Sequence, residues 1–163
     1  MPFDCFMTLD GIDGESTDTN HANAIELLSF SFGATQAVGS SVSTGGARSG
    51  ERVALQDFTI TKVLDKASPK LFLNCCNGTH ISTVTIDVCR ATGSKQTYME
   101  YAMEDVLITG YHPSGSSGGE IPIESVSLNP AKVTLTYTTT DHDTGDSSGN
   151  VTAYWDQSTN DGS

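Results

Sequence analysis

The 163-residue chain has the length of a single domain, and its formal net charge of -12 comes from 20 acidic against 8 basic side chains. Phosphate binding needs clustered lysine and arginine, so this charge argues against nucleic acid and against insertion into or binding to an anionic membrane. Only 17% of the residues are charged, because serine, threonine and glycine are abundant. That composition favours an all-β domain with many turns.

Residues 3–9 alternate apolar and polar and are predicted to form the first strand. The N-terminus shows no basic segment and no long apolar run, so we expect no signal peptide, no membrane span, and folding in the cytoplasm. Four cysteines without a C-x-x-C pair fit this compartment as buried, reduced thiols rather than zinc ligands.

A polar loop over residues 10–23 leads to a predicted second strand over residues 25–36. Alternation places Phe30 and Phe32 in the core and turns Ser29 and Ser31 to the opposite face. A free sheet surface usually carries larger polar side chains. The small hydroxyl residues therefore suggest a wall from which bulky groups are kept away.

Residues 38–51 are rich in glycine and serine and are predicted to form an extended loop. Loops of this length without their own structure tend to be functional or disordered. In the strand that follows, Phe58 and Ile60 are predicted to point into the core. Thr59 faces the other way, like the serines of the second strand.

Residues 68–77 form the one convincing helix in the sequence. Ser68 suits the N-cap, Pro69 suits the first helical position, and Gly78 supplies a left-handed end. The helix is short and needs a sheet to pack against. Its predicted apolar stripe consists of Leu71, Phe72, Cys75 and Cys76.

The C-terminal half is predicted to be strands joined by polar connections. The predicted strands cover residues 80–90, 96–110, 121–128, 132–140 and 151–155. Asn129-Pro130 is expected to separate the third and fourth of these strands. Val126 and Leu128 are assigned to the core and Ser127 to the opposite face, while residues 157–163 are expected to be a polar tail.

The sequence contains no coherent catalytic or metal-binding set. Cys76 and His80 are four residues apart, but a helix ending at Gly78 would separate them. The run from Asp141 to Asp146 lacks the glycine and glutamate of a calcium loop and favours a hairpin turn. His21 and His112 fall in polar loops and are expected to be solvated. We therefore expect no catalytic residue, no metal and no cofactor.

Several motifs together resemble the Hcp family, the tube proteins of type VI secretion. Residues 14–33 begin with Gly-Glu-Ser, contain His21, and end a strand with Phe-Ser-Phe-Gly, as the opening of that family does. Residues 124–137 are similar to the family pattern Glu-x-Val-x-Leu-x-x-x-Lys-(Val/Ile)-x-x-x-Tyr. Segments 55–62, 65–69 and 76–80 match in order and spacing, and Trp155 stands where the last strand of the family carries an aromatic residue.

The resemblance implies one ring-forming domain over residues 1–163, a β-barrel of two packed antiparallel sheets with one short α-helix alongside. It implies homohexameric rings that stack into a tube, effectors carried in the lumen, a spike protein at the tip and a contractile sheath around the tube. It also implies a cytoplasmic protein that is later secreted without a signal peptide. The residues expected to face the lumen are Ser29, Ser31, Thr59 and Ser127. Those expected to contact the neighbouring ring are Val42, Ser43 and Arg48.

Three other functions fit parts of the same pattern. A tail-tube protein of a phage-like contractile particle would share the sheet arrangement. A β-sandwich module that binds sugars or peptides would expose aromatic residues on one face, whereas Phe30 and Phe32 alternate with serine and favour the core. A hydrolase would need the catalytic set that the sequence lacks.

Overall fold

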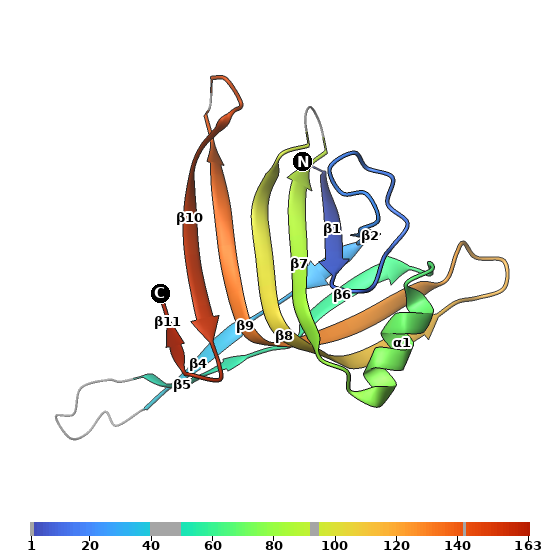
Figure 1. The fold of residues 1–163 in the computed structure, drawn as a ribbon, viewed down its shortest axis with the longest axis horizontal. Helices are drawn as coiled ribbons and strands as arrows, with labels where there is room; N and C mark the ends of the chain where they lie inside the picture. The colour runs from blue at the N-terminus through green and yellow to red at the C-terminus, as the bar shows by residue number, and fades with distance from the viewer. Residues whose placement is uncertain (1, 40–49, 92–94, 142) are drawn as a thin grey trace.

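The computed structural model describes residues 2–39, 50–91, 95–141 and 143–163, and the described chain is mainly β with one short helix (Figure 1). The predicted loop residues Val42, Ser43 and Arg48 lie outside the described residues. The elements in chain order are β1 (Phe3–Leu9), β2 (Ile25–Glu26), β3 (Ser29–Ser31), β4 (Ala34–Val38), β5 (Gly50–Leu55), β6 (Phe58–Val63), α1 (Ser68–Asn77), β7 (Ile81–Arg90), β8 (Thr97–Ser114), β9 (Ile123–Thr140), β10 (Ser147–Asp156) and β11 (Asp161–Gly162).

All strand pairs are antiparallel, and nine strands belong to one sheet. The main path runs β11-β10-β9-β8-β7-β1-β2, while β6 pairs with the first half of β9 and β3 pairs with β6. Strands β4 and β5 form a separate two-stranded sheet at one end of the molecule (Figure 1). The predicted mainly β, antiparallel fold class is therefore confirmed, and its two layers are halves of one bent sheet.

The expected break at Pro130 is wrong, because β9 is continuous from Ile123 to Thr140. Its first half pairs with β6 as far as Leu128, and its second half pairs with β10 from Lys132 onward. Pro130 lies between these two partners, where a missing backbone N–H breaks few bonds of the ladder.

The predicted second strand is also corrected, because residues 25–36 form three short strands. Strand β2 pairs with β1, β3 with β6, and β4 with β5. The chain thus changes partner twice within twelve residues. Smaller boundaries differ as well. Strand β5 begins at Gly50 within the predicted 38–51 loop, and β10 begins at Ser147 rather than at residue 151. Strand β8 extends to Ser114, into the polar loop predicted around His112, and β11 in the predicted tail pairs with β10.

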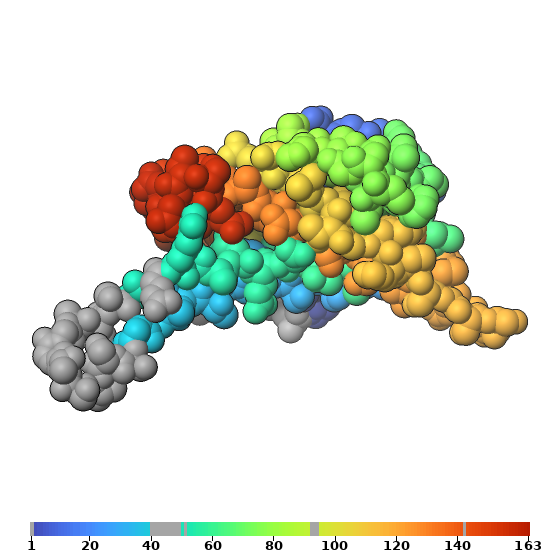
Figure 2. Space-filling view, turned by 90° about the horizontal axis from the view of Figure 1, so that it is seen from below, coloured from blue at the N-terminus to red at the C-terminus, as the bar shows by residue number. Residues whose placement is uncertain are grey.

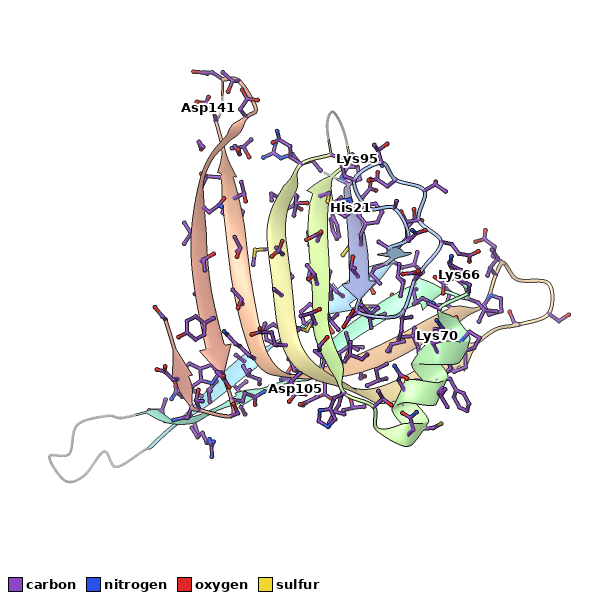
Figure 3. All side chains as sticks on the ribbon, in the orientation of Figure 1. His21, Lys66, Lys70, Lys95, Asp105 and Asp141 are labelled. Atoms are coloured by element: carbon purple, nitrogen blue, oxygen red, sulfur yellow. The ribbon has the colours of Figure 1, made fainter. Side chains whose placement is uncertain are left out.

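Strand β8 bends near Asp105 (Figure 1 and Figure 3), whose φ of 51° lies in the left-handed region. On either side, Glu104 pairs with Lys132 and Val106 with Pro130, so the bend falls opposite the partner change in β9. Aspartate tolerates this conformation better than most residues. The bend lets the two halves of the sheet face each other across the core.

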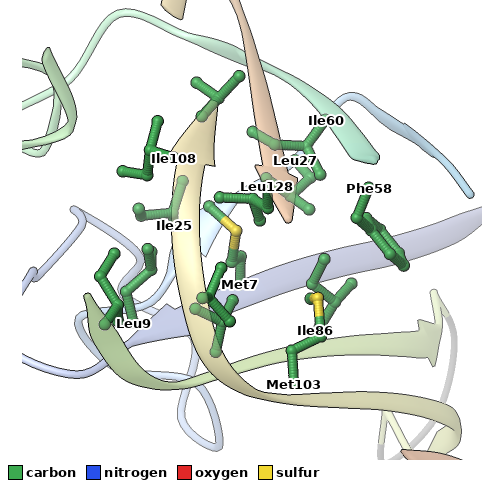
Figure 4. Packing of buried hydrophobic residues seen from close by; sticks show 14 of the residues in the cluster. Met7, Leu9, Ile25, Leu27, Phe58, Ile60, Ile86, Met103, Ile108 and Leu128 are labelled. Atoms are coloured by element: carbon green, nitrogen blue, oxygen red, sulfur yellow. The ribbon is translucent and has the colours of Figure 1, made fainter. Parts of the chain in front are cut away.

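The core fills the space between the two halves of the sheet (Figure 4). Five of the eight predicted core residues are fully buried, namely Phe58, Ile60, Leu71, Val126 and Leu128. Phe30 and Phe32 are partly buried and stack on Phe58, with ring centroids 5.9 and 5.2 Å away. Phe72 is not a core residue, since 55% of it is exposed.

Helix α1 lies on the surface with much of its length open to solvent (Figure 2). Its residues Ser68 and Leu71 are buried, so the apolar stripe is narrower than predicted. Ala67 rather than Ser68 occupies the N-cap position, while Gly78 ends the helix at a φ of 66° as expected. The hydroxyl of Ser68 is used elsewhere, in a buried polar network.

Candidate functional site

Three neighbouring strands bring hydroxyl side chains together on the face opposite the core. We call this surface the hydroxyl panel, and it comprises Ser29 and Ser31 of β3, Thr59 and Thr61 of β6, and Ser125 and Ser127 of β9. All four predicted lumen residues belong to it. The panel arises because the side chains alternate: the residues between them point into the core.

The strand registers arrange the panel in two rows. Ser29 lies opposite Thr61, which lies opposite Ser125, and this makes the first row. The second row consists of Ser31, Thr59 and Ser127 in the same order. The hydroxyls of Ser29 and Thr61 are hydrogen bonded at 2.5 Å. The two serines of β3 are exposed and the four other side chains are partly exposed, so both rows reach the surface of the single chain.

Strand β8 continues both rows with two residues that are not among the predicted lumen residues. Gly110 pairs with Ser127, and His112 pairs with Ser125. A Cβ atom on Gly110 would lie 3.2 Å from the His112 Nε2 atom, so a larger residue would require the His112 ring to shift, whereas its 3.4 Å distance to the Ser127 Oγ atom is an ordinary contact. The exposed His112 lies in β8 rather than in the predicted loop.

The panel side chains themselves carry no charge, although the chain as a whole is strongly acidic. One residue before β6, Asp57 shares the panel side by alternation, but its carboxylate is engaged. It accepts hydrogen bonds from Thr109 Oγ1 at 2.7 Å and from Asn129 Nδ2 at 2.9 Å. The panel therefore offers hydrogen-bonding hydroxyl groups without a dominant sign of charge.

A second cluster surrounds His21, and the prediction that this side chain is solvated is wrong. Its ring stacks on Phe6 with centroids 4.4 Å apart, and its side chain is only 9% exposed. Nδ1 lies 3.2 Å from Asp18 Oδ1, and Nε2 lies 3.1 Å from Asp87 Oδ2. Figure 3 shows His21 beside Lys95 at one edge of the sheet. The contact with Asp87, which is 66 residues away, ties the loop over residues 10–24 to β7.

The cluster resembles a catalytic triad in which Cys89 would be the nucleophile, His21 the base and Asp18 the acid, because Cys89 Sγ lies 3.8 Å from His21 Nε2 and His21 Nδ1 lies next to Asp18. Its chemistry does not support catalysis by a thiolate. Cys89 is fully buried, and burial raises the pKa of its thiol, whereas a nucleophilic cysteine needs a lowered one. Asp87 also competes for the same histidine nitrogen, and burial raises the pKa of this carboxyl. The geometry instead fits a structural anchor.

The electrostatics around Asp18 support that structural role. Lys95 Nζ lies 3.0 Å from Asp18 Oδ2 and 3.3 Å from Asp4 Oδ2. The hydrogen bonds from Lys95 and His21 lower the pKa of Asp18 to about 2, so this carboxylate is ionised at neutral pH. The loop is thus fixed by charged groups from three separate segments.

The other sequence candidates do not form reactive sites. His80 Nδ1 pairs with Asp105 Oδ1 at 2.6 Å, on an exposed surface, and the described contacts of His80 do not include Cys76. The Asp141 carboxylate accepts the backbone N–H groups of Asp143 and Thr144, as the predicted hairpin turn requires. Within the described ranges, no group of three His, Cys, Asp or Glu side chains could hold a metal ion.

A groove of about 840 Å³ opens near the end of β3, lined by Leu28, Val63, Ile121 and Ile123 together with small loop residues. Glu120 is the one charged residue in its lining, and no aromatic ring lines it. Sugar-binding and peptide-binding sites usually combine aromatic residues with convergent polar groups. This groove therefore gives no support to the ligand-binding alternative.

No helix in the described part of the chain is long and apolar enough to cross a lipid bilayer. The bent antiparallel sheet and the uncharged hydroxyl panel are features of a structural β-protein that presents one polar face.

Comparison with known proteins agrees with this class. A family model described as "Type VI secretion system effector, Hcp" matches residues 6–137. Protein hcp1 of Pseudomonas aeruginosa is 31% identical over 138 residues, which are 84% of each chain. A solved structure described as a type six secretion system protein has a TM-score of 0.93 and 30% identity, and covers 99% of this chain and 100% of its own. Hcp1 from Salmonella typhimurium has a TM-score of 0.80 at 30% identity, with the same coverage.

The chain belongs to the Hcp family of type VI secretion, as its motifs predicted. Its function is accordingly that of a structural tube protein of this system.

Proposed function

We propose that this chain assembles into homohexameric rings that stack into a tube, with the hydroxyl panel facing the lumen. The observation that carries the proposal is the pairing of β3, β6 and β9, which gathers Ser29, Ser31, Thr59 and Ser127 on one face that reaches the surface of the chain. A passage for folded cargo needs a wall of small polar groups without protruding side chains. Six copies of the panel around an axis would make such a wall.

Secreted effectors are the proposed occupants of the lumen, and the panel is their contact surface. Because the panel is uncharged, it would hold cargo through many weak hydrogen bonds rather than through a few ion pairs. Cargo held in this way can be both retained and released. We propose no catalytic step and no cofactor for this activity.

The remaining proposed partners follow from the family. The loop over residues 38–51 would contact the neighbouring ring, with Val42, Ser43 and Arg48 as contact residues, and the tube would meet a spike protein at its tip and a contractile sheath around it. The protein would reside in the cytoplasm before the tube is expelled and would then be secreted. A phage-like tail tube remains the alternative assembly, and it would lack secreted cargo in the lumen.

Size-exclusion chromatography with light scattering tests the ring. Six chains of 17.2 kDa make a particle of about 103 kDa, whereas a stable monomer of 17.2 kDa at micromolar concentration would contradict the proposal. Substitution Ser31→Gln tests the lumen assignment. We expect the ring to persist while co-purified effector decreases, because a long side chain would intrude into the passage. A matched substitution outside the panel, Thr152→Gln on the exposed β10, should leave effector binding unchanged.

Loss of the ring itself in Ser31→Gln would place Ser31 in a packed interface rather than in the lumen. Equal loss of effector in both variants would show that the panel has no special role.

A further inference from the structure

Directly behind the hydroxyl panel, two charged side chains are completely buried. Lys62 of β6 and Glu124 of β9 are both 0% exposed and lie opposite each other in the ladder. Lys62 Nζ is 2.7 Å from Glu124 Oε2. Charged residues are almost never fully buried unless they are paired, so this pair needs a reason.

The pair is saturated by groups from the elements that surround it. Lys62 Nζ also contacts Asp65 Oδ1 at 2.9 Å and the backbone carbonyl of Val63 at 3.0 Å. Ser68 at the start of α1 donates its hydroxyl to Glu124 Oε2 at 2.9 Å, and Tyr111 of β8 donates to Glu124 Oε1. The network therefore joins β6, β8, β9 and α1 at one point.

Apolar packing alone does not fix how β6 is aligned with β9. In the native register Phe58 faces Leu128 and Ile60 faces Val126. A shift by one residue would turn the hydroxyl residues into the core, so the alternation opposes it. A shift by two residues keeps every hydroxyl outside and every apolar residue inside, with Ile60 facing Leu128.

The buried charges distinguish these two alignments. After the two-residue shift, Lys62 would face Val126 and keep only Asp65, which moves with β6, as a counter-charge. Glu124 would lose its only cationic partner among the described residues and would remain in the core as a carboxylate without a counter-charge. We propose that Lys62 and Glu124 are positioning residues that set the β6–β9 register and thereby align the two rows of the hydroxyl panel. The panel's role in cargo contact rests on the proposed function, but the alignment itself does not.

Paired cysteines on the panel can report the register directly. Thr59→Cys with Ser127→Cys places two thiols directly opposite each other in the native register, within reach of a disulfide. Thr61→Cys with Ser127→Cys are opposite only after the two-residue shift. Both reporters are made with Cys75→Ser and Cys76→Ser, since these two native cysteines are the ones that are not fully buried.

Each reporter is oxidised in the full chain, and the disulfide-linked peptides are quantified by mass spectrometry. In the parent chain we expect the native reporter to form its disulfide and the shifted reporter to form little. In the chain with Lys62→Met and Glu124→Met, the shifted disulfide should rise by about tenfold or more, because the charge penalty that opposed the shift is gone. Replacing both charges together avoids leaving either one unpaired in the core.

The Lys132–Glu104 pair provides a matched control. It also joins opposite positions on two antiparallel strands, β9 and β8, with Nζ 3.3 Å from Oε2, but both side chains are partly exposed. Lys132→Met with Glu104→Met should leave both reporters as in the parent. The proposal is overturned if the Lys62→Met, Glu124→Met chain forms only the native disulfide, or if the control raises the shifted disulfide equally. A failure of the ring proposal would appear in the particle mass and not in these disulfides.

Discussion

Substitution of Phe58 and of Phe72 tests whether the buried phenylalanine contributes more to stability than the exposed one. Phe58 is completely buried and contacts three aromatic rings, with centroids of Phe30, Phe32 and Tyr101 at 5.9, 5.2 and 5.3 Å. Phe72 on α1 is 55% exposed and contacts one ring, that of Tyr111 at 5.9 Å. The same substitution to alanine should therefore have very different costs.

Phe58→Ala removes a buried ring and leaves a cavity, which costs about 3–5 kcal/mol. We expect the upper end of that range, because aromatic pairs contribute about 0.5–1.5 kcal/mol each beyond buried area. For a chain of this length, such a loss lowers the melting temperature by roughly 10–20 °C. Phe72→Ala loses one half-exposed ring contact and should cost about 1 kcal/mol or less.

Urea denaturation followed by circular dichroism measures both variants at several protein concentrations. The concentration series matters because burial of Phe72 between chains would make its cost rise with concentration. An equal cost for the two variants at every concentration would refute the division between core and surface. A cost of Phe58→Ala below about 2 kcal/mol would show that the aromatic cluster does not organise the core.

Three further predictions concern titration, backbone strain and thiol reactivity. Burial alone would raise the pKa of Glu124, but hydrogen bonds from its neighbours hold this pKa below the usual value of 4.5. The ionised carboxylate therefore stabilises the fold above pH 4.5, and this contribution is lost as the pH falls through the lowered pKa. Acid unfolding should consequently be less steep in Glu124→Gln than in the parent chain. At Asp105, with its φ of 51°, substitution to glycine should be tolerated, while Asp105→Val should cost about 1–3 kcal/mol in thermal unfolding. Burial raises the pKa of the Cys5 thiol to about 12 and raises the pKa of the Cys89 thiol above its usual value. In the native chain, iodoacetamide should therefore label the exposed Cys76 and spare Cys5 and Cys89, which peptide mass spectrometry measures. Labelling of all three cysteines at one rate would contradict the burial of Cys5 and Cys89.

Alternation along the strands was sufficient to predict both faces of the central sheet. It assigns Phe58, Ile60, Val126 and Leu128 to the core, and the structure buries all four. The same period of two placed the serines and threonines on the opposite face. This success has a simple reason: a strand that borders a core on one side must bury every second residue, whichever strand pairs with it.

The pairing partners could not be predicted in this way, because a period of two contains no information about the neighbouring strand. Residues 25–36 alternate as one strand would, yet they pair with three different strands in turn. In the same way, His21 looked solvated because its partner Asp87 is 66 residues away. Only Asp18, three residues before His21, gave a local signal for that cluster.

The buried charge pair also has a signal in the sequence, although the prediction did not include it. Lys62 continues the inward series of Phe58 and Ile60, and Glu124 begins the inward series of Val126 and Leu128. A lysine and a glutamate, each in phase with a core face on a different strand, are expected to meet, because either alone would be an uncompensated buried charge. Charged residues at inward-facing strand positions can thus predict which two strands pair, whereas the hydrophobic pattern cannot.

Closure of the fold depends on a coincidence between two strands that each look unfavourable alone. Asp105 interrupts β8 with a left-handed backbone, and Pro130 lacks an N–H in the middle of β9. The ladder places Val106 opposite Pro130, so both irregularities fall at the same level of the sheet. There β9 exchanges β6 for β10, and the sheet bends over its own core. Each irregularity is tolerated because the other one removes the need for a straight ladder at that point. The bend in turn separates the half of the sheet that carries the hydroxyl panel, where β9 pairs with β6, from the half where β9 pairs with β10.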